Sequence, residues 1–205
     1  MTTLTKPTAR AASTALALEH ASDFAASADN AIKRMCDIFA SLLGIILLTP
    51  VWIIVALAVR LNDGGPAFFT QERVGLNGTT FTMFKFRTMR VDAEAMKASL
   101  VEANEADSSA GNSIMFKMTN DPRITRIGAF LRKTSIDELP QLFNVLRGDM
   151  SLVGPRPPLP SEVAQYEPRV MGKFAVRPGI TGLWQISGRS NLSWDETVHL
   201  DLSYA

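Results

Sequence analysis

Two adjacent acids, Asp137 and Glu138, are the residues whose types and spacing most directly suggest chemistry. Proline lacks an N–H and is tolerated only in the first turn of a helix, so Pro140 predicts a helix that begins near Asp137, capped by Asp137 or Ser135. Basic residues flank the pair on both sides: Arg132, Lys133, Arg147 and Arg156. Carboxylates at a positive helix end, ringed by arginines, suit a site that holds a phosphate and attacks it. The alternative is that both acids only offset the helix dipole.

A β-hairpin is expected upstream of the acids. Residues 67–76 and 79–89 are rich in β-forming residues and are joined by Asn77-Gly78, a strong hairpin signal. Strand alternation in the second run places Lys85 and Arg87 on one face. These cations either face water or meet a phosphate, and the pattern leaves both interpretations open.

Helices are expected to place Arg132 beside Asp137. Asp121 at a cap and Pro122 at the first helical position predict a helix that ends near Arg132. The link from there to the Asp137 helix is short, so the turn would bring Arg132 close to Asp137. Further helices are predicted from Asp92 to about Glu105, from Ser161, and from the capping box Ser193–Glu196.

Arg156 lies in the segment Gly154–Pro158, with prolines on both sides. Prolines fix the backbone near polyproline II, so Arg156 is expected on a stiff strut that loses little entropy on binding. The alternative is a rigid surface linker with an exposed arginine.

Residues 38–59 are apolar and carry no charge. At about 1.5 Å per residue they cover roughly 30 Å, enough to cross a bilayer once. Pro50 near the middle predicts a kink. Basic residues flank the run on both sides, at Lys33-Arg34 and at Arg60, whereas a spanning helix gathers them at its cytoplasmic end. A re-entrant helix and a single-pass anchor are equally compatible with this pattern.

Composition excludes several classes of protein. The chain of 205 residues has a net charge of +1, which does not suggest a nucleic-acid partner. Cys36 is the only cysteine, and His20 and His199 are far apart, so neither a disulfide framework nor a zinc-ligand spacing is present. Residues 1–30 are rich in Ala, Ser and Thr and are expected to form a flexible tail rather than a signal peptide.

Five ordered motifs carry a resemblance to a known family: Lys33-Arg34-x-x-Asp37, Lys85–Met89, Leu131–Gln141, Gly154–Pro157 and Arg177–Gly182. Together they resemble the bacterial sugar transferase family, the monotopic phosphoglycosyl transferases, over residues 32–204. The resemblance implies transfer of a sugar-1-phosphate from a UDP-sugar to a polyprenyl phosphate, such as undecaprenyl phosphate, with release of UMP. It also implies a first step of exopolysaccharide or other glycan assembly. The segment Gly182–Gln185 is similar to that of members that transfer glucose or galactose phosphate.

The resemblance also assigns the site. It implies that Asp137 is the nucleophile that forms a phosphosugar-aspartate, with Glu138 beside it and Mg²⁺ bound by one or both. Lys85, Arg132 and Arg156 match the basic positions around the substrate phosphates. The implied location is the cytoplasmic face of the bacterial inner membrane.

The expected fold class is α/β (α+β), a re-entrant membrane helix followed by a compact helical catalytic domain with a small β-hairpin. Residues 1–30 would be the tail, 31–61 the re-entrant helix broken near Pro50, and 62–205 a cytoplasmic catalytic domain that is short at its C-terminus. A lipid bilayer is an expected partner, nucleic acid is not, and a homo-oligomer is compatible with the sequence. Two rival functions are a phosphohydrolase with the same Asp–Mg²⁺ chemistry and a non-catalytic module of a polysaccharide assembly complex.

Overall fold

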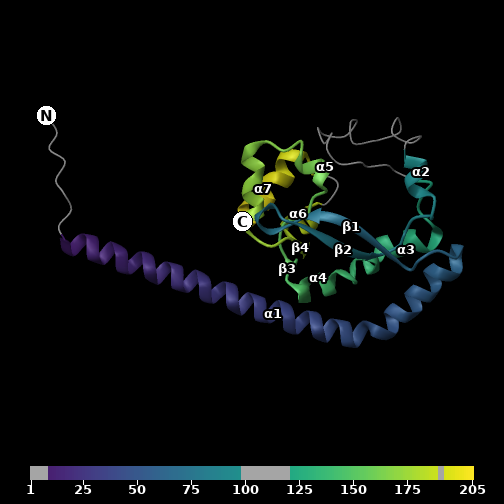
Figure 1. Cartoon of the computed structure of the whole chain (residues 1–205), viewed down its shortest axis with the longest axis horizontal. Coiled ribbons are helices and arrows are strands. Elements are labelled where there is room, and N and C mark those ends of the chain that lie inside the picture. The colour runs from purple at the N-terminus through teal and green to yellow at the C-terminus, as the bar shows by residue number, and fades with distance from the viewer. Residues whose placement is uncertain (1–8, 98–120, 189–191) are drawn as a thin grey trace.

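A computed structural model describes residues 9–97, 121–188 and 192–205, with side chains from residue 30 onward (Figure 1). The chain has mixed secondary structure: one long N-terminal helix, short helices, and two small two-stranded sheets. The expected α+β class is confirmed in this respect. The predicted helix beyond Lys97 and the linker after it lie in residues 98–120, outside the described part.

Helix α1 (Ala9–Asp63) runs through Pro50 without interruption. Figure 1 shows that it changes direction in its later part, which contains this proline. The tail expected over residues 1–30 is helical from Ala9 in the structure, and the many alanines, the strongest helix formers, give the physical reason. The structure thus has a bend in this part of α1, as a proline kink predicts, but the helix is not broken at Pro50. Entry and exit on the same side of a bilayer remains a prediction.

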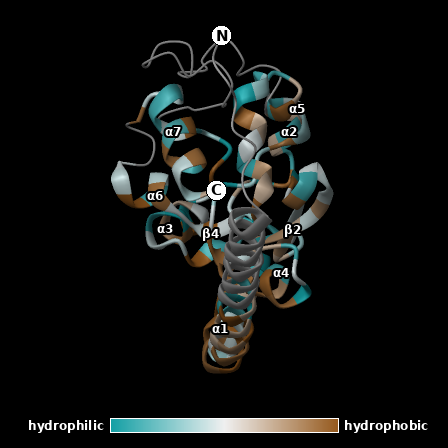
Figure 2. Ribbon diagram, turned by 90° about the vertical axis from the view of Figure 1, so that its left-hand side faces the viewer, coloured by the Kyte–Doolittle hydropathy of each residue, from teal (hydrophilic) through white to brown (hydrophobic). Residues whose placement is uncertain are grey.

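The segment Asn30–Asp63 is long and apolar enough to cross a membrane, with a mean hydropathy of 2.8. Only 11% of its apolar window is buried inside the protein, so it is not the core helix of a soluble domain. Phe39, Leu47 and Ile54 are each about two-thirds exposed or more. Figure 2, which looks along α1, shows apolar residues gathered on this helix below the domain. Such a continuous exposed apolar surface indicates membrane association.

Polar side chains near the start of this segment attach α1 to the domain. Asp37 is buried and accepts hydrogen bonds from Ser151 Oγ at 2.8 Å and from the backbone N–H of Leu152 at 3.1 Å. Lys33 pairs with Asp37 at 3.2 Å. Arg34 donates to the carbonyls of Val145 and Leu146, at the end of helix α4. The resembling motif Lys33-Arg34-x-x-Asp37 is therefore a docking element.

Strands β1 (Phe68–Val74) and β2 (Thr80–Phe86) form the predicted antiparallel hairpin. The turn is the 3₁₀ segment η1 (Leu76–Gly78), in which Asn77 and Gly78 both have positive φ. This is the left-handed conformation that Asn-Gly favours in hairpin turns. Helix α2 (Ala93–Lys97) follows the hairpin.

The edge of β2 is held by the buried side chain of Asn144. Its amide accepts from Phe84 N–H at 3.0 Å and donates to Thr82 C=O at 2.7 Å, as a neighbouring strand would. Asn144 belongs to helix α4 (Gln141–Arg147), so the hairpin is fixed to the helix that follows the two acids. An unpaired strand edge is thereby satisfied.

Helix α3 (Arg126–Thr134) begins later than predicted. Its N-cap is Thr125, whose side chain accepts from Gly128 N–H at 2.9 Å, so Asp121 and Pro122 do not open the helix. Asp121 instead forms an ion pair with Arg123, and both side chains are buried. The carboxylate that could have capped the helix is held by a guanidinium, and Thr125 supplies the cap.

The helix predicted to begin at Asp137 is also displaced. Residues Ile136–Glu138 form a 3₁₀ turn, η3, and α4 starts after it with Pro140 as the residue at its N-cap. Ser135 adopts a left-handed conformation, with φ of 58°, at the end of α3. Because α3 ends abruptly at Ser135, only a tight turn fits between it and Pro140, and Asp137 and Glu138 lie on that turn.

The C-terminal part contains strands β3 (Ser151–Val153) and β4 (Gly179–Thr181), which pair in parallel. The other elements are α5 (Pro160–Val163), η4 (Pro168–Ala175), α6 (Leu183–Ser187) and α7 (Trp194–Tyr204). The capping box predicted at Ser193–Glu196 is confirmed. A Cβ on Gly154 would lie 2.4 Å from Arg177 C=O, and one on Gly182 would lie 2.2 Å from Gly154 C=O. These motif glycines let the two segments pack backbone against backbone.

One apolar cluster joins the membrane helix to the elements that follow it. Its buried members are Trp52, Val55, Val59, Phe86, Leu131 and Leu142. They come from α1, β2, α3 and α4, and Ile136 of η3 packs against them. The turn that carries the two acids therefore packs against a cluster to which the membrane helix contributes.

Candidate active site

Asp137 is buried on η3, with 7% of its surface exposed. Burial raises the pKa of its carboxyl above the ordinary value, Glu138 adds to this, and the charges of Lys85 and Arg132 oppose it. No hydrogen bond joins this carboxylate to another side chain in the described part of the chain. A desolvated carboxylate near cations, with no described side chain hydrogen-bonded to it, has the environment that a nucleophile requires.

Glu138 is tied to the hairpin. Its Oε1 atom lies 2.7 Å from the ammonium of Lys85 on β2, and both side chains are partly exposed. Lys85 therefore does not simply face water, because its ammonium meets a carboxylate, and its contact with a phosphate stays a prediction. Arg87 is also not solvated, since it is buried and pairs with Asp63 at the end of α1.

Arg132 lies near Asp137, as the short link predicted. Its charge acts on the Asp137 carboxyl, and the Asp137 charge in turn partly offsets the lowering of the Arg132 pKa by burial. The guanidinium is held by Thr88, whose hydroxyl accepts from Nε at 2.9 Å. Thr88 was not predicted as a site residue, although it lies in the motif Lys85–Met89.

Gly128 permits this contact. It is buried in α3, and a Cβ there would lie 1.9 Å from the carbonyl oxygen of Thr88. The close approach also lets Thr125 N–H donate to that carbonyl at 3.0 Å. The orientation of Arg132 therefore depends on backbone contact between α3 and the end of the hairpin.

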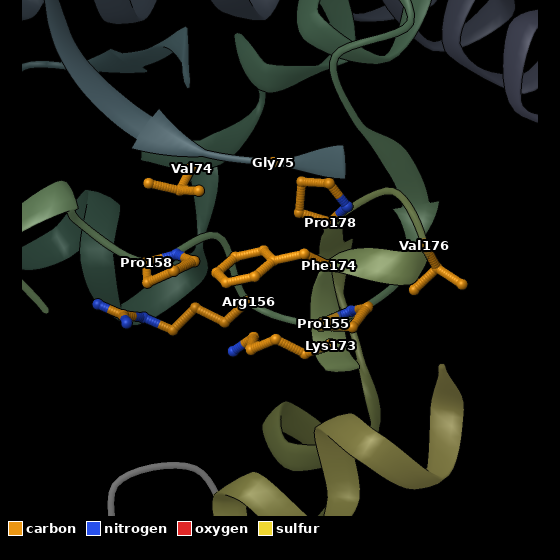
Figure 3. A pocket seen from close by; sticks show the side chains of 9 residues that line it. All are labelled: Val74, Gly75, Pro155, Arg156, Pro158, Lys173, Phe174, Val176 and Pro178. Carbon is orange, nitrogen blue, oxygen red and sulfur yellow. The ribbon is translucent and has the colours of Figure 1, made fainter. Parts of the chain in front are cut away.

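Arg156 lies in a different group from Asp137. Its guanidinium forms an ion pair with Glu162 at 3.1 Å, and the strut is attached to β1 through Arg73 and Val74. Figure 3 shows its stem beside Pro158 and Phe174, with the guanidinium pointing away from the other residues that line this pocket. The structure brings Lys85, Arg132, Asp137 and Glu138 together, and Arg156 forms no hydrogen bond or ion pair with any of these described residues. Arg73 links the two groups, because its charge interacts with both Arg156 and Glu138.

Arg73 and Glu162 were missed by sequence reasoning. Arg73 lies in a strand where an arginine ordinarily faces water, and Glu162 lies in a short helix after prolines. Only the folded arrangement of β1, the strut and α5 gives them a role.

The chemistry of Asp137 and Glu138 fits a magnesium ion. Mg²⁺ prefers oxygen ligands and commonly takes one or two carboxylates together with substrate phosphate oxygens and water. No group of three or more His, Cys, Asp or Glu that could hold a metal occurs in the described residues, so a site made of protein ligands alone is not present there. A two-carboxylate site completed by substrate remains compatible with these residues.

The exposed apolar helix and the carboxylate among cations define a membrane-associated protein with a site for anionic chemistry. The family model described as bacterial sugar transferase matches residues 28–205. The chain belongs to this family of transferase enzymes, so the resemblance drawn from the five motifs is confirmed.

Curated relatives agree with this assignment. Galactosyl transferase CpsE of Streptococcus agalactiae serotype III is 51% identical over 173 residues, which are 84% of this chain and 37% of the relative. Undecaprenyl-phosphate galactose phosphotransferase of Salmonella typhimurium is 45% identical over 173 residues, 84% of this chain and 36% of the relative. Exopolysaccharide production protein ExoY of Sinorhizobium fredii is 41% identical over 172 residues, 84% of this chain and 76% of the relative. The chain thus spans little more than a third of the first two relatives.

Proposed function

We propose that this protein transfers a sugar-1-phosphate from a UDP-sugar to polyprenyl phosphate and releases UMP. Galactose-1-phosphate or glucose-1-phosphate is the proposed group, and undecaprenyl phosphate the proposed acceptor. The names of the relatives from Streptococcus agalactiae and Salmonella typhimurium support galactose. The relative named for exopolysaccharide production supports a role in making that class of polymer.

The observation that carries the proposal is the environment of Asp137. A buried carboxylate is costly to ionise, and this one has the ammonium of Lys85 and the guanidinium of Arg132 close enough to act on its pKa. The same cations would neutralise the charge of a diphosphate, which otherwise repels an anionic nucleophile. Ile136 of the turn also packs against the apolar cluster that the membrane helix shares with β2, α3 and α4, and a site attached to that helix suits a lipid-borne acceptor.

The proposed reaction has two steps. In the first, an oxygen of Asp137 bonds to the sugar-bearing phosphorus, and the bond from that phosphorus to the bridging oxygen breaks, so that UMP leaves with the electron pair. In the second, an oxygen of polyprenyl phosphate attacks the same phosphorus and the Asp137 carboxylate is released. Lys85 and Arg132 would hold the phosphate oxygens in line during both steps. Glu138 would keep Lys85 in position until the donor arrives.

Asp137 and Glu138 are the residues proposed to hold Mg²⁺ together with phosphate oxygens. When bound, the ion supplies positive charge that offsets the charge developing on the transferred phosphoryl group. The protein's own part is to hold these two carboxylates adjacent on one 3₁₀ turn.

We also propose that α1 is re-entrant and leaves the catalytic domain on the cytoplasmic face of the inner membrane. UDP-sugars are cytoplasmic and strongly anionic, so they reach only a site on that face. The basic flanks Lys33, Arg34 and Arg60 on both sides of the apolar segment support this topology.

UMP release tests the function. The protein in nanodiscs would be incubated with Mg²⁺, undecaprenyl phosphate and a panel of UDP-sugars. Asp137→Asn is expected to abolish release, whereas Asp195→Asn, which removes an exposed carboxylate on α7, should leave it unchanged. Release of free sugar phosphate to water without lipid would instead support a phosphohydrolase. Silence of the folded protein across the panel would contradict the proposal.

A further inference from the structure

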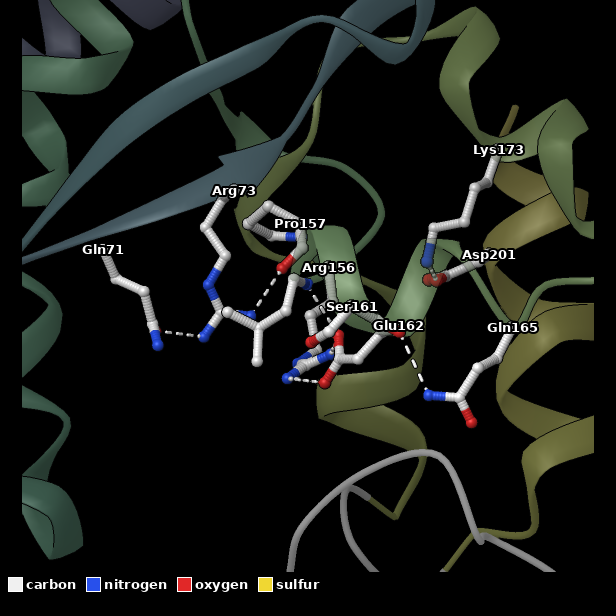
Figure 4. A network of polar contacts seen from close by, with 10 residues as sticks. Gln71, Arg73, Arg156, Pro157, Ser161, Glu162, Gln165, Lys173 and Asp201 are labelled. Carbon is white, nitrogen blue, oxygen red and sulfur yellow. Dashed lines mark hydrogen bonds and ion pairs between the residues drawn. The ribbon is translucent and has the colours of Figure 1, made fainter. Parts of the chain in front are cut away.

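A second group of charges lies on the hairpin, the strut and α5, apart from the Asp137 turn, and has no role in the two steps above. It contains the guanidinium groups of Arg73 and Arg156 and the buried carboxylate of Glu162. Figure 4 shows these side chains converging from β1, from the strut Gly154–Pro158 and from α5.

Both carboxylate oxygens of Glu162 face the guanidinium of Arg156, and one of them also accepts a backbone hydrogen bond. Its Oε2 atom accepts from Arg156 Nη1 at 3.1 Å and from the backbone N–H of Leu159 at 2.8 Å, and its Oε1 atom lies 3.4 Å from Arg156 Nη2. A guanidinium paired in this bidentate way with a buried carboxylate has its charge largely cancelled. Taken alone, Arg156 would have little positive charge to offer an anion.

Arg73 changes this balance. Its Nη1 atom donates to Pro157 C=O at 3.0 Å and its Nη2 atom to Gln71 Oε1 at 2.6 Å, so both are spent on neutral acceptors. Its Nε–H is buried and has no hydrogen-bond partner among the described residues. Burial and then the charge of Arg156 lower the pKa of Arg73 to about 10, a value that leaves it cationic at neutral pH.

The neighbouring charges do not cancel this excess. Lys173 and Asp201 form a buried ion pair of their own, shown apart from the two arginines in Figure 4. Tyr166 stays neutral, because burial raises its pKa. The group of Arg73, Arg156 and Glu162 therefore keeps one positive charge unbalanced, and the separate Lys173–Asp201 pair adds no net charge to it. Arg73 supplies that charge.

The hairpin register places this charge on the face of the hairpin that carries Lys85. Phe69 is opposite Lys85, so the alternate residues Gln71 and Arg73 lie on the same face as Lys85. Arg73 is four residues along β1 from the position opposite Lys85, about 13 Å at a strand rise of 3.3 Å per residue. The electrostatic interaction of Arg73 with Glu138 joins the two ends of this face.

We propose that Arg73 is a positioning residue that keeps Arg156 and its surroundings attractive to the anionic donor by offsetting the neutralisation of Arg156 by Glu162. This inference rests on the proposed function, because the donor is taken to be a nucleoside diphosphate sugar. Arg73 acts through Arg156 in two ways: it fixes the strut at Pro157, and it contributes the unbalanced charge.

Charge-balance variants separate these two contributions. Arg73→Met should weaken binding of UDP about tenfold or more and raise the KM for the UDP-sugar, because one net charge is lost from a partly desolvated site. Adding Glu162→Gln to this variant restores the net charge and leaves an amide oxygen for Leu159 N–H. The double variant should recover most of the UDP affinity. Arg73→Lys should stay within about threefold of the native protein.

Arg169→Met is the matched control, since Arg169 is an exposed arginine paired with Glu167 and Asp195. It should bind UDP as the native protein does. Equilibrium binding of UDP needs no turnover, so the measurement is independent of whether the transfer reaction has been established. Unchanged binding in Arg73→Met would overturn the inference. Equal losses in Arg73→Met and Arg73→Lys without recovery by Glu162→Gln would also overturn it, because Arg73 would then only brace the strut. A native protein that binds no UDP would overturn both this inference and the proposed donor.

Discussion

Gly128→Ala tests whether backbone contact between α3 and the end of the hairpin positions Arg132 beside Asp137. In an ordinary helix this change stabilises by about 1 kcal/mol, because alanine has the higher helix propensity. Here the new Cβ would lie 1.9 Å from the Thr88 carbonyl oxygen and 2.6 Å from its carbon, and both are backbone atoms that cannot rotate away. Reaching an ordinary contact of 3.4 Å requires α3 to move by about 1.5 Å.

That movement would separate Arg132 Nε from Thr88 Oγ1, now 2.9 Å apart, and displace Arg132 from Asp137. Misplacement by about 1 Å costs roughly a hundredfold in rate, so kcat/KM for UMP release should fall about a hundredfold. Overpacking costs about 1–3 kcal/mol of stability, which is more than the gain in helix propensity over most of this range. The Tm should therefore fall by a few degrees.

The assay combines UMP release in nanodiscs with thermal unfolding of the same preparations. Ala129→Gly is the matched control, because Ala129 is the exposed neighbour on the same helix. It should lower the Tm slightly through propensity and keep kcat/KM within about twofold. Full activity together with a raised Tm in Gly128→Ala would refute the steric reasoning.

Three further predictions follow from burial and charge. The rate of UMP release should rise with pH through an acidic limb that lies above the ordinary aspartate range, because burial raises the pKa of Asp137 and only the ionised carboxylate attacks. Lys85→Met should move this limb to still higher pH, because the positive charge of Lys85 lowers the pKa of Asp137. A limb that stays in place would exclude Lys85 as a neighbour of the nucleophile. Asp137→Asn should raise the Tm at pH 8 and not at pH 3. A carboxyl whose pKa is raised in the folded state destabilises that state once it is ionised, so the destabilisation appears as the pH rises. An equal gain in Tm at both pH values would contradict that cause. Asp37→Ala should destabilise the protein by about 2–4 kcal/mol, measured by thermal or chemical unfolding in detergent, because Ser151 Oγ and Leu152 N–H lose a buried acceptor; an unchanged stability would show that these contacts do not dock α1.

The sequence predicted the elements whose signals are local. The hairpin turn at Asn77-Gly78 and the capping box at Ser193 were both confirmed, because each depends on a few neighbouring residues. The short link before Asp137 also correctly placed Arg132 near the acids. Two helix starts were wrong, since Asp121 was taken by Arg123 and the left-handed Ser135 forced a 3₁₀ turn before Pro140.

The electrostatic partners were beyond sequence reasoning for a physical reason. Glu162 meets Arg156 only after the prolines have folded the strut over α5, and Arg73 joins them from β1, more than eighty positions upstream in the chain. The same holds for Asp37, which contacts Ser151 across the whole domain. Long-range pairs of this kind carry no periodicity or spacing signal in a single sequence.

The covalent step is the central claim and can be observed directly. The native protein would be incubated with Mg²⁺ and its UDP-sugar in the absence of polyprenyl phosphate, and its intact mass measured after quenching. The account predicts one added sugar phosphate per chain, located on the peptide that contains Asp137 and lost when polyprenyl phosphate is supplied. Asp137→Asn should acquire no mass. An active protein that never gains this mass, and that releases UMP only when both substrates are bound together, would contradict the account and show direct transfer.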